Sequence, residues 1–439
     1  MRVSPKLAVL FICLSIGASG LRAQQFYWDT ASTRSTGMGG VYVASSSNVV
    51  DALASNPAGL SYLRGRNLNV EADAIFARGS FDDSSNNGAP LGDSPGFIPY
   101  GAFGMPIPHS RFSFGVSLTP DLLSQGDWHY VDPPGFAGAS YGLQKQFSEI
   151  YALRYTAGLG FAVNSRLSIG ATFGADYNSN RLQAPYIFQT QPVLAGMKTL
   201  LDMHTTGYGW NASVGVMARP TRRLDAGVSW KSRTVINSTG WATGDAYAQF
   251  AALGVNAPST FTYSSKVQNV LPQRVNADIA WHATSRWLFA FQTDWVNWHN
   301  SFVTLPVTLT NGTNATLNSL VGGTSLNDRV PLDWKDQYVF HFAAERSLKE
   351  SVTLRAGYSH ANSPVPDSTL TPLTAAIFTD QISAGLTYRH GHAQYEGAYS
   401  FGPQATQSVG QSGLLSGEYD NSSVHVGTQS VKLGLTYTF

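Results

Sequence analysis

The last nine residues of the chain alternate between apolar side chains and polar or small ones, and they read Val431-Lys432-Leu433-Gly434-Leu435-Thr436-Tyr437-Thr438-Phe439. A period of two residues is typical of a β-strand that presents one face to an apolar environment. The same alternation recurs along most of the chain, whereas a helical period does not. It therefore decides the fold class.

Fourteen segments of the chain show this alternation. Their connections alternate in length: six are short turns, such as residues 108–110 and 284–285, and seven are long loops, such as residues 239–269 and 300–335. Short turns on one side and long loops on the other are typical of outer-membrane β-barrels, whereas a soluble sandwich has no reason to sort its loops by length. The segments begin near Asn67, Phe97, Arg111, Phe147, Arg166, Thr206, Arg223, Val270, Arg286, Asp336, Ser351, Phe378, His392 and Gly427.

The composition favours a membrane barrel. Only 13% of the 439 residues are charged, about half of the ~25% that is usual in soluble domains. An aromatic content of 12% excludes a disordered chain. The 28 Lys and Arg residues balance the 27 Asp and Glu residues, so nothing indicates a nucleic-acid partner. The histidines lack the spacing of metal ligands, and we expect no metal or cofactor.

The first 23 residues predict a cleaved signal peptide. Arg2 and Lys6 precede an apolar stretch at residues 7–16 that is too short to span a bilayer as a helix, and small residues follow up to Ala23. The single cysteine, Cys13, lies in this leader, so we expect no disulfide in the exported chain. No later run of about 18 apolar residues occurs, so strands would have to cross any membrane.

Residues 24–66 precede the first strand and do not alternate. They contain a glycine-rich stretch at residues 37–40 and a predicted helix at residues 48–55, which Asn48 would cap and Pro57 would end. About forty residues are too few for an independent domain with a good core. In a barrel with both chain ends on one side, we expect this segment to lie in the lumen as a plug.

Two stretches resemble the FadL family of outer-membrane transporters for long-chain fatty acids and other hydrophobic compounds. The first is GMGGVYVA at residues 37–44 followed by NPAGL at residues 56–60, which is similar to the family's N-terminal hatch. The second is LRAGY at residues 354–358, continuing to NSPVPD at residues 362–367. The resemblance implies an all-β fold, namely a 14-stranded antiparallel transmembrane β-barrel formed by residues 67–439, with residues 24–66 as a hatch in its lumen.

The same resemblance implies passive transport across the outer membrane of a bacterium, with no enzymatic activity. The expected partners are hydrophobic small molecules (fatty acids or aromatic hydrocarbons), outer-membrane lipid and lipopolysaccharide. The terminal Phe439 resembles the signal that barrel-assembly machinery reads, which is a further expected partner. Two alternatives stay open. A general porin for polar solutes leaves residues 24–66 unexplained, and an outer-membrane lipase has no clear catalytic serine, because the GASYG stretch at residues 138–142 lies in a loop.

Two of the long loops are unexpectedly apolar, because hydrophobic residues recur in them at helical spacing. Either each predicted helix packs on its own loop, or the two helices form a landing surface for a hydrophobic ligand. The resemblance favours the second interpretation, since members of the family capture substrate in a groove between such loops. The residues concerned are Val193, Leu194, Met197, Leu200 and Leu201 in the third long loop, and Tyr247 and Phe250 in the fourth.

The third strand is interrupted by Pro120. Proline lacks an N–H group and cannot serve an inner ladder, so it predicts a break in the wall if it lies at membrane depth. The alternative is that Pro120 already belongs to the extracellular loop. The resemblance implies an inward kink at residues 118–124 that opens a lateral gap beside the hatch. The residues assigned to this exit are Leu122 and Leu123, as ligand contacts, and Asn56, Pro57, Ala58, Gly59 and Pro120, as gate and hatch.

Alternation also places five basic residues on the lumen side. One of them could pair with a ligand carboxylate, or all of them could belong to an ordinary network with Asp225, Asp278, Glu345 or Glu396. The five are Arg154, Lys231, Arg233, Arg355 and Arg389.

Overall fold

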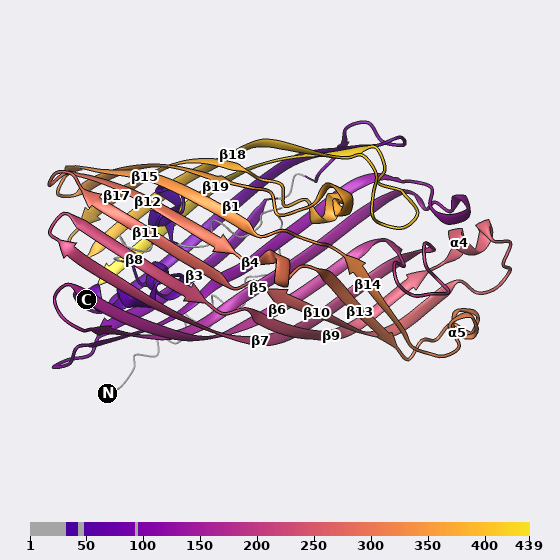
Figure 1. The fold of residues 1–439 in the computed structure, drawn as a ribbon, viewed down its shortest axis with the longest axis horizontal. Coiled ribbons are helices and arrows are strands. Elements are labelled where there is room, and N and C mark those ends of the chain that lie inside the picture. Colours follow the sequence, from indigo (N-terminus) through magenta and orange to yellow (C-terminus); the bar gives the residue numbers. More distant parts are fainter. Residues whose placement is uncertain (1–31, 43–47, 93–94) are drawn as a thin grey trace.

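The computed structural model describes residues 32–42, 48–92 and 95–439, and the predicted signal peptide lies outside these ranges. The described chain forms one antiparallel sheet that closes on itself, because the last strand, β19 (Ser422–Thr438), pairs with the first, β1 (Asn67–Asp82). Figure 1 shows the resulting elongated cylinder, in which the strands are tilted against the long axis. The fold is therefore the closed barrel that the alternation predicts.

Fourteen strands of the described chain make the wall, as predicted. Four of them are interrupted and carry two labels each. β8 and β9 both pair with β7, and the two parts of each later interrupted strand pair with the two parts of the one before it. A two-residue strand, β2 (Ala89–Pro90), pairs with the end of β1. After β1 the wall strands are β3 (Gly96–Pro106), β4 (Phe112–Asp132), β5 (Gly142–Ala162), β6 (Leu167–Ile187), β7 (Lys198–Thr221), β8 (Leu224–Lys231) with β9 (Thr234–Asp245), β10 (Thr260–Leu271) with β11 (Arg274–His282), β12 (Trp287–Val296) with β13 (Thr304–Thr310), β14 (Leu326–Pro331) with β15 (Gln337–Lys349), β16 (Val352–Ala361), β17 (Asp380–His390), β18 (Ala393–Val409) and β19.

The strands extend farther toward the long-loop end than the sequence predicts. β9 and β10 occupy much of the predicted loop 239–269, and β13 and β14 occupy much of the predicted loop 300–335. Along β10, Phe261 and Tyr263 are buried, whereas the alternate positions Thr260, Thr262 and Ser264 are exposed. The outward residues of these segments are polar because the segments lie beyond the apolar layer of the membrane. They therefore lack the outward apolar row by which the other wall strands are recognised in the sequence.

The short turns lie together at the other end of the barrel. They connect neighbouring strands through residues 107–111, 163–166, 222–223, 283–286, 350–351 and 391–392. The chain also ends there, since the Phe439 N–H group donates to the Arg66 carbonyl at 2.9 Å. In outer-membrane barrels the short-turn end faces the periplasm, so the opposite end is extracellular.

Residues 32–42 and 48–66, here called the N-terminal segment, contain three short helices. They are α2 (Thr33–Gly37), α3 (Val49–Ala54) and η1 (Pro57–Tyr62), and Figure 1 shows their indigo coils within the cylinder. The Asn48 side chain accepts a hydrogen bond from the Val50 N–H group, so α3 begins at the predicted cap. All of α2 and most of α3 are buried.

The remaining helices lie toward the extracellular end. α4 (Tyr247–Ala252) confirms the helix predicted in the fourth long loop, and α5 (Ala315–Val321) follows β13 (Figure 1). The helix predicted in the third long loop is wrong: residues 191–197 form turns, and Leu200 and Leu201 belong to β7 and pair with β6 and β9. Gly196 has a φ of +80°, which lies outside the helical region and interrupts a helix in the middle of this stretch. Four 3₁₀ turns complete the helical elements: η2 (Phe136–Gly138), η3 (Trp298–Asn300), η4 (Asp367–Thr369) and η5 (Pro372–Thr374).

The helices in the described part of the chain are all too short or too polar to cross a membrane.

Candidate functional site

The barrel wall contains a seam between β3 and β4. Their ladder stops where Gly101 lies opposite Leu118. Beyond that point β3 pairs with β1 and β4 pairs with β5. Contact across the seam resumes at Leu91, which forms a single bridge to Trp128. Between Leu118 and Trp128, one side of β4 therefore lacks a ladder partner in the part of the chain that the structure describes.

β4 turns inward along this seam. A wall strand normally alternates between buried and exposed residues, but every residue of β4 from Ser117 to Gly126 is buried. The ladder with β5 shifts register there, because Pro120 pairs with Leu153 and the next paired residue is Leu122. An extra residue of this kind bends a strand. Pro120 thus lies within a wall strand and not in an extracellular loop.

Leu122 and Leu123 connect two apolar clusters. Leu122 belongs to a large group of side chains, here called the aromatic cluster, which includes Trp128 and Trp334 and reaches into the extracellular loops. Leu123 belongs to a smaller group with Leu53 of α3 and with residues of β3. The kink therefore brings β4 into contact with the N-terminal segment on one side and with the aromatic cluster on the other.

The aromatic cluster is the main feature that sequence reasoning missed. The Trp298 and Trp334 rings lie 5.0 Å apart, and the Phe302 ring lies 4.9 Å from the first and 4.8 Å from the second. All three side chains are buried. They come from the interruptions between β12 and β13 and between β14 and β15. Large aromatic residues just outside an alternating row were the signal that could have revealed them.

The NPAG motif of the N-terminal segment lies against β6, β7 and β8. Asn56 Nδ2 donates to the carbonyls of Val216, at 3.1 Å, and Val228, at 3.3 Å. A Cβ on Gly170 of β6 would come within 2.3 Å of the Pro57 backbone. The Ala58 and Gly59 N–H groups donate back to Asn56. Leu53 of α3 and Leu60 of η1 share a cluster with Leu123 of the kink, while Asn56 itself bonds to β7 and β8.

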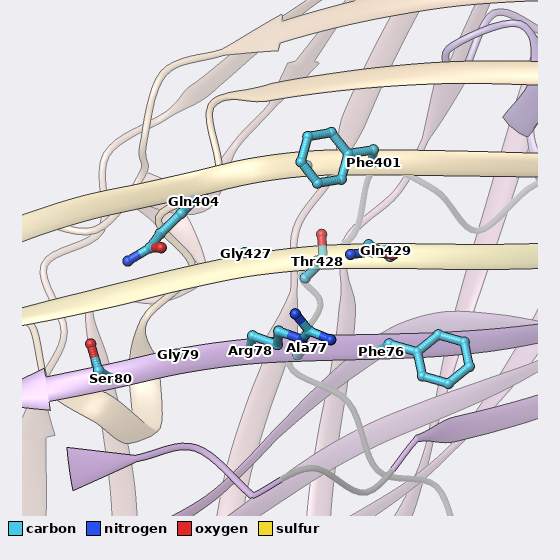
Figure 2. A pocket seen from close by; sticks show the side chains of 11 residues that line it. Phe76, Ala77, Arg78, Gly79, Ser80, Phe401, Gln404, Gly427, Thr428 and Gln429 are labelled. Carbon is cyan, nitrogen blue, oxygen red and sulfur yellow. The ribbon is translucent and has the colours of Figure 1, made fainter. Parts of the chain in front are cut away.

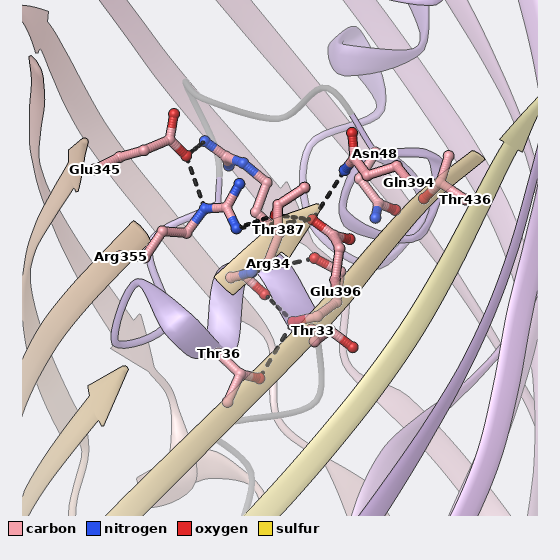
Figure 3. A network of polar contacts seen from close by, with 12 residues as sticks. Thr33, Arg34, Thr36, Asn48, Glu345, Arg355, Thr387, Gln394, Glu396 and Thr436 are labelled. Carbon is pink, nitrogen blue, oxygen red and sulfur yellow. Dashed lines mark hydrogen bonds and ion pairs between the residues drawn. The ribbon is translucent and has the colours of Figure 1, made fainter. Parts of the chain in front are cut away.

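The N-terminal segment is also tied to the opposite wall. Arg34 of α2 lies 3.1 Å from the Glu345 carboxylate on β15, and Arg355 Nε on β16 lies 2.7 Å from the same oxygen (Figure 3). Arg355 Nη1 donates to Thr387 Oγ1 at 2.5 Å and lies 3.8 Å from Glu396. Arg355 therefore belongs to a buried network that orients α2.

Glu71 of β1 connects α2 and α3 from a third direction. Its Oε2 accepts hydrogen bonds from the Thr33 N–H group, at 2.5 Å, and from Thr33 Oγ1, at 2.8 Å. Its Oε1 accepts a bond from Asn48 Nδ2 at 3.3 Å. One carboxylate thus binds the beginnings of both helices, where N–H groups are otherwise unpaired.

The two stretches that resemble the FadL family meet each other. A Cβ on Gly357 of β16 would come within 2.1 Å of the Gly39 nitrogen. The Gly39 carbonyl accepts bonds from Ser359 Oγ, at 2.7 Å, and lies 2.5 Å from His341 Nδ1. Position 357 requires glycine because the backbone of Gly39 occupies the space that a side chain at position 357 would fill.

The predicted loop residues divide into a buried and an exposed group. Leu194, Leu201 and Phe250 are buried together in one cluster, with Met197 packed beside it. Val193 and Tyr247 are exposed, and Leu200 is half-buried in β7. The structure therefore brings the two loops together, but most of their apolar residues pack against each other.

A buried ion-pair group joins three extracellular segments. Lys198 Nζ, at the start of β7, lies 2.7 Å from Asp132, at the end of β4, and 2.5 Å from Glu418, in the loop before β19. All three side chains are almost inaccessible to solvent. Burial raises the pKa of Glu418 to about 7, although Lys198 opposes this shift.

The five predicted lumen cations differ in their surroundings. Lys231 is buried and donates to Asp121, the extra residue of the β4 bulge. Arg154 is also buried; its Nη2 donates to Thr172 Oγ1 at 3.2 Å, whereas Nε and Nη1 have no hydrogen-bond partner in the described part of the chain. Arg389 Nε donates to Gln394, and Gln394 donates to the buried Glu396, so Arg389 shares the inner face with Glu396. Arg233 and Arg389 are both exposed to solvent. They lie in the break between β8 and β9 and beside a short turn, where the alternation no longer points into a packed lumen.

No three or more His, Cys, Asp or Glu side chains in the described ranges are grouped so that they could hold a metal ion.

A closed barrel with an internal N-terminal segment and a kinked wall strand defines a transmembrane β-barrel of the outer membrane. The chain belongs to the outer membrane protein transport protein family (OMPP1/FadL/TodX), whose model matches residues 14–439. The family is one of transport proteins, so the chain is a transporter and not an enzyme. The search of functionally characterised sequences returned no significant match.

Solved structures show the same fold. The chain is similar to the Ralstonia pickettii toluene transporter TbuX, with 18% identity over 94% of this chain and 99% of that one and a TM-score of 0.71. It is also similar to the Pseudomonas putida toluene transporter TodX, with 18% identity over 94% of this chain and 99% of that one and a TM-score of 0.73. A third similar structure is a Pseudomonas aeruginosa FadL homologue, with 16% identity over 94% of this chain and 100% of that one and a TM-score of 0.72.

Proposed function

We propose that this protein is a passive route for hydrophobic small molecules, which enter between the extracellular loops, pass the aromatic cluster and leave sideways through the β3–β4 seam. The observation that carries the proposal is the end of the β3–β4 ladder at Gly101 and Leu118, followed by the continuously buried part of β4. A lateral exit lets an apolar molecule reach the lipid without crossing the water of the periplasm.

Entry is supported by apolar side chains that remain exposed at the extracellular end. Val193, Tyr247 and Leu253 lie on the two neighbouring loops, and Phe136 and Leu143 lie beyond the end of β4. Exposed apolar surface is costly in water unless something binds to it. The buried cluster of Leu194, Leu201 and Phe250 would hold this surface in shape.

The N-terminal segment acts as the hatch in this proposal. It contacts Leu123 in the kink through α3, and Arg34 and Glu71 anchor it on other strands. A small displacement of α3 would uncover the inner side of the seam. The hydrogen bonds and ion pairs to the wall then set how easily this displacement occurs.

Arg154 supports a substrate that carries a carboxylate, such as a fatty acid. It is 1% exposed, and two of its donor atoms lack partners in the described chain. Asp121 and Asp176 both lie within electrostatic range of Arg154, but neither accepts a hydrogen bond from its guanidinium in the described chain. A buried cation without a full complement of partners is costly, and a ligand carboxylate would relieve that cost. The toluene carried by the transporters TodX and TbuX has no such group, so substrate choice tests this point.

The exit is tested by straightening β4. Deleting Asp121 and replacing Pro120 by Val removes the extra residue and restores the alternation along the strand. We expect uptake of radiolabelled oleate and toluene, in cells that lack a transporter of their own, to fall about tenfold or more. The control is Asp121→Asn, which loses the ion pair to Lys231 but keeps the bulge. Heat-modifiable migration in gels checks that each variant folds. Unchanged uptake by the straightened, folded barrel would refute lateral release.

A further inference from the structure

A hollow of about 890 Å³ opens where β1, β18 and β19 run side by side (Figure 2). It arises from a bulge in β18: Gly402 pairs with Thr428, but Ala405 pairs with Val426, so β18 contains one extra residue. Gly427, which faces the bulge, contributes no side chain to fill the space. The hollow is therefore built into the wall and does not depend on a loop.

The hollow lies on the outer face of the barrel. Phe76 and Phe401, which line it, are 45% and 39% exposed. On the inner face of the same wall, Trp128 fills the space beside Gly79, since a Cβ there would come within 3.0 Å of its ring. The hollow thus faces the membrane, whereas Ala77, which also lines it, packs against the aromatic cluster inside the wall.

The hollow lies where the outer face changes from apolar to polar. On each of its three strands, the outward row is apolar from the periplasmic end up to this level and polar beyond it. The apolar row of β1 covers nine positions, and at a rise of ~3.3 Å and a tilt of ~45° it spans about 20 Å of membrane thickness. That is close to the ~25 Å apolar band of such barrels. The rows run from Leu68 to Phe76 and then Arg78 on β1, from Tyr395 to Phe401 and then Gln404 on β18, and from Phe439 to Val431 and then Gln429 on β19.

Arg78 is the charged residue of this hollow. It is exposed and has no hydrogen bond or ion pair within the described ranges. Figure 2 shows it beside Thr428 and Gln429 of β19, with Gln404 of β18 across the hollow. Gln429 Oε1 accepts a bond from the Tyr399 hydroxyl at 3.0 Å, so its amide nitrogen can donate to a ligand.

We propose that this hollow binds the phosphorylated head of a glycolipid in the outer leaflet, such as the lipid A part of lipopolysaccharide. The guanidinium of Arg78 would bind a phosphate through two parallel hydrogen bonds. The amides of Gln404 and Gln429 are placed to bind sugar hydroxyl groups, and Phe76 and Phe401 face the acyl chains just below. The position at the boundary of the apolar band on the extracellular side selects a membrane lipid over a dissolved anion.

A second outer hollow shows what a purely apolar site looks like. It has a volume of about 520 Å³, lies on strands β4 to β8, and is lined by residues such as Phe112, Leu159 and Val214. No charged residue lines it. Such a hollow can hold acyl chains but offers nothing to a phosphate, so the charged hollow at Arg78 is distinct.

The proposal is tested with the full exported protein in detergent, by native mass spectrometry with lipid A that carries two, one or no phosphates. We expect Arg78→Gln to weaken binding of the doubly phosphorylated form about tenfold, the loss of one charge-assisted contact. Arg78→Lys should lie in between. The control Lys266→Gln removes an exposed cation of β10 far from this hollow and should change nothing.

Three results would overturn the proposal. In the first, Arg78→Gln binds phosphorylated lipid A as tightly as the unchanged protein. In the second, the unchanged protein does not distinguish phosphorylated from dephosphorylated lipid. In the third, inorganic phosphate displaces the lipid at low millimolar concentration, which would make the hollow a simple anion site. Because Arg78 has no partner within the described protein, its replacement is not expected to prevent folding, and heat-modifiable migration verifies this.

Discussion

Arg34 and Arg355 bind the same oxygen atom of Glu345, the first from inside the lumen at 3.1 Å and the second from the wall at 2.7 Å. One carboxylate thus joins the N-terminal segment to the barrel. Without Arg34, Glu345 keeps Arg355 as its partner and is not left as an isolated charge. This makes Arg34 a site where the segment can be loosened with little damage to the wall.

Arg34→Ala should therefore loosen the N-terminal segment. We expect single-channel conductance in planar bilayers to rise several-fold, because α2 loses its ion pair to β15. The matched control is Arg389→Ala, which removes an exposed arginine near a short turn whose one bond within the described ranges goes to Gln394. Equal conductance of the Arg34 variant and the unchanged protein would show that other contacts hold the segment alone.

Gly357→Val should displace the N-terminal segment by steric conflict. A Cβ at this position would lie 2.1 Å from the Gly39 nitrogen, so the segment or the strand has to move. We expect a loss of about 1–3 kcal/mol, typical of overpacking, seen as a lower temperature of thermal unfolding. Gly397→Val is the control, since the nearest atom to a Cβ added at Gly397 would be Leu433 Cδ2, at 3.9 Å. Equal melting temperatures for the two variants would contradict the close contact.

Arg154→Met should separate the two substrate classes. The change keeps a long side chain and removes the buried charge, so oleate uptake should fall about tenfold while toluene uptake stays constant. Arg181→Met, at an exposed arginine whose guanidinium lies over the Phe147 ring, serves as the control. An equal decrease for both substrates would assign Arg154 to the structure of the lumen and not to recognition.

The Lys198 group predicts a pH dependence of the extracellular loop before β19. The pKa of Glu418 is about 7 when the loop is closed and returns to about 4.5 when the loop opens into water. Between these values the closed loop binds more protons than the open loop, so the free energy of opening falls as pH rises through this window. Below about pH 4.5 and above about pH 7, the protonation of Glu418 should no longer change the free energy of loop opening with pH.

A spin label at Leu415→Cys reports this opening, since Leu415 lies three residues from Glu418 and the chain's only cysteine is Cys13. The label should be more mobile at pH 8 than at pH 5. Glu418→Gln should abolish most of the difference, whereas Glu350→Gln, at an exposed acid of a short turn, should preserve it. A pH response that survives Glu418→Gln would assign it to other groups.

The number of strands could be read from the sequence because lipid imposes it. Each wall strand places apolar residues outward over the thickness of the membrane, as in the row from Leu433 to Phe439. Beyond the membrane that constraint disappears, so the sequence predicts loops where the structure has most of β9, β10, β13 and β14. Their outward threonines and serines face water, while Phe261 and Tyr263 still face inward.

The site was only partly predictable for a related reason. Pro120 identified the kink because proline cannot serve a ladder on both sides. The partner of the kink depends on contacts distant in sequence, and local patterns could not show that α3 lies there while Asn56 binds β7 and β8. Trp298 and Trp334 come from separate interruptions, and their stacking likewise requires the closed barrel.

The pairing of β1 with β19 has a consequence for biogenesis. Thr438 Oγ1 donates to Asn67 at 2.8 Å across 371 positions of sequence. Until the final strand is available, the sheet has two open edges, and lipid cannot hydrogen-bond to them. Membrane insertion must therefore wait for the complete polypeptide, and contacts this distant in sequence make closure slow. A chain that stops short of β19 should yield no leaky intermediate but an aggregation-prone precursor held back by periplasmic quality control.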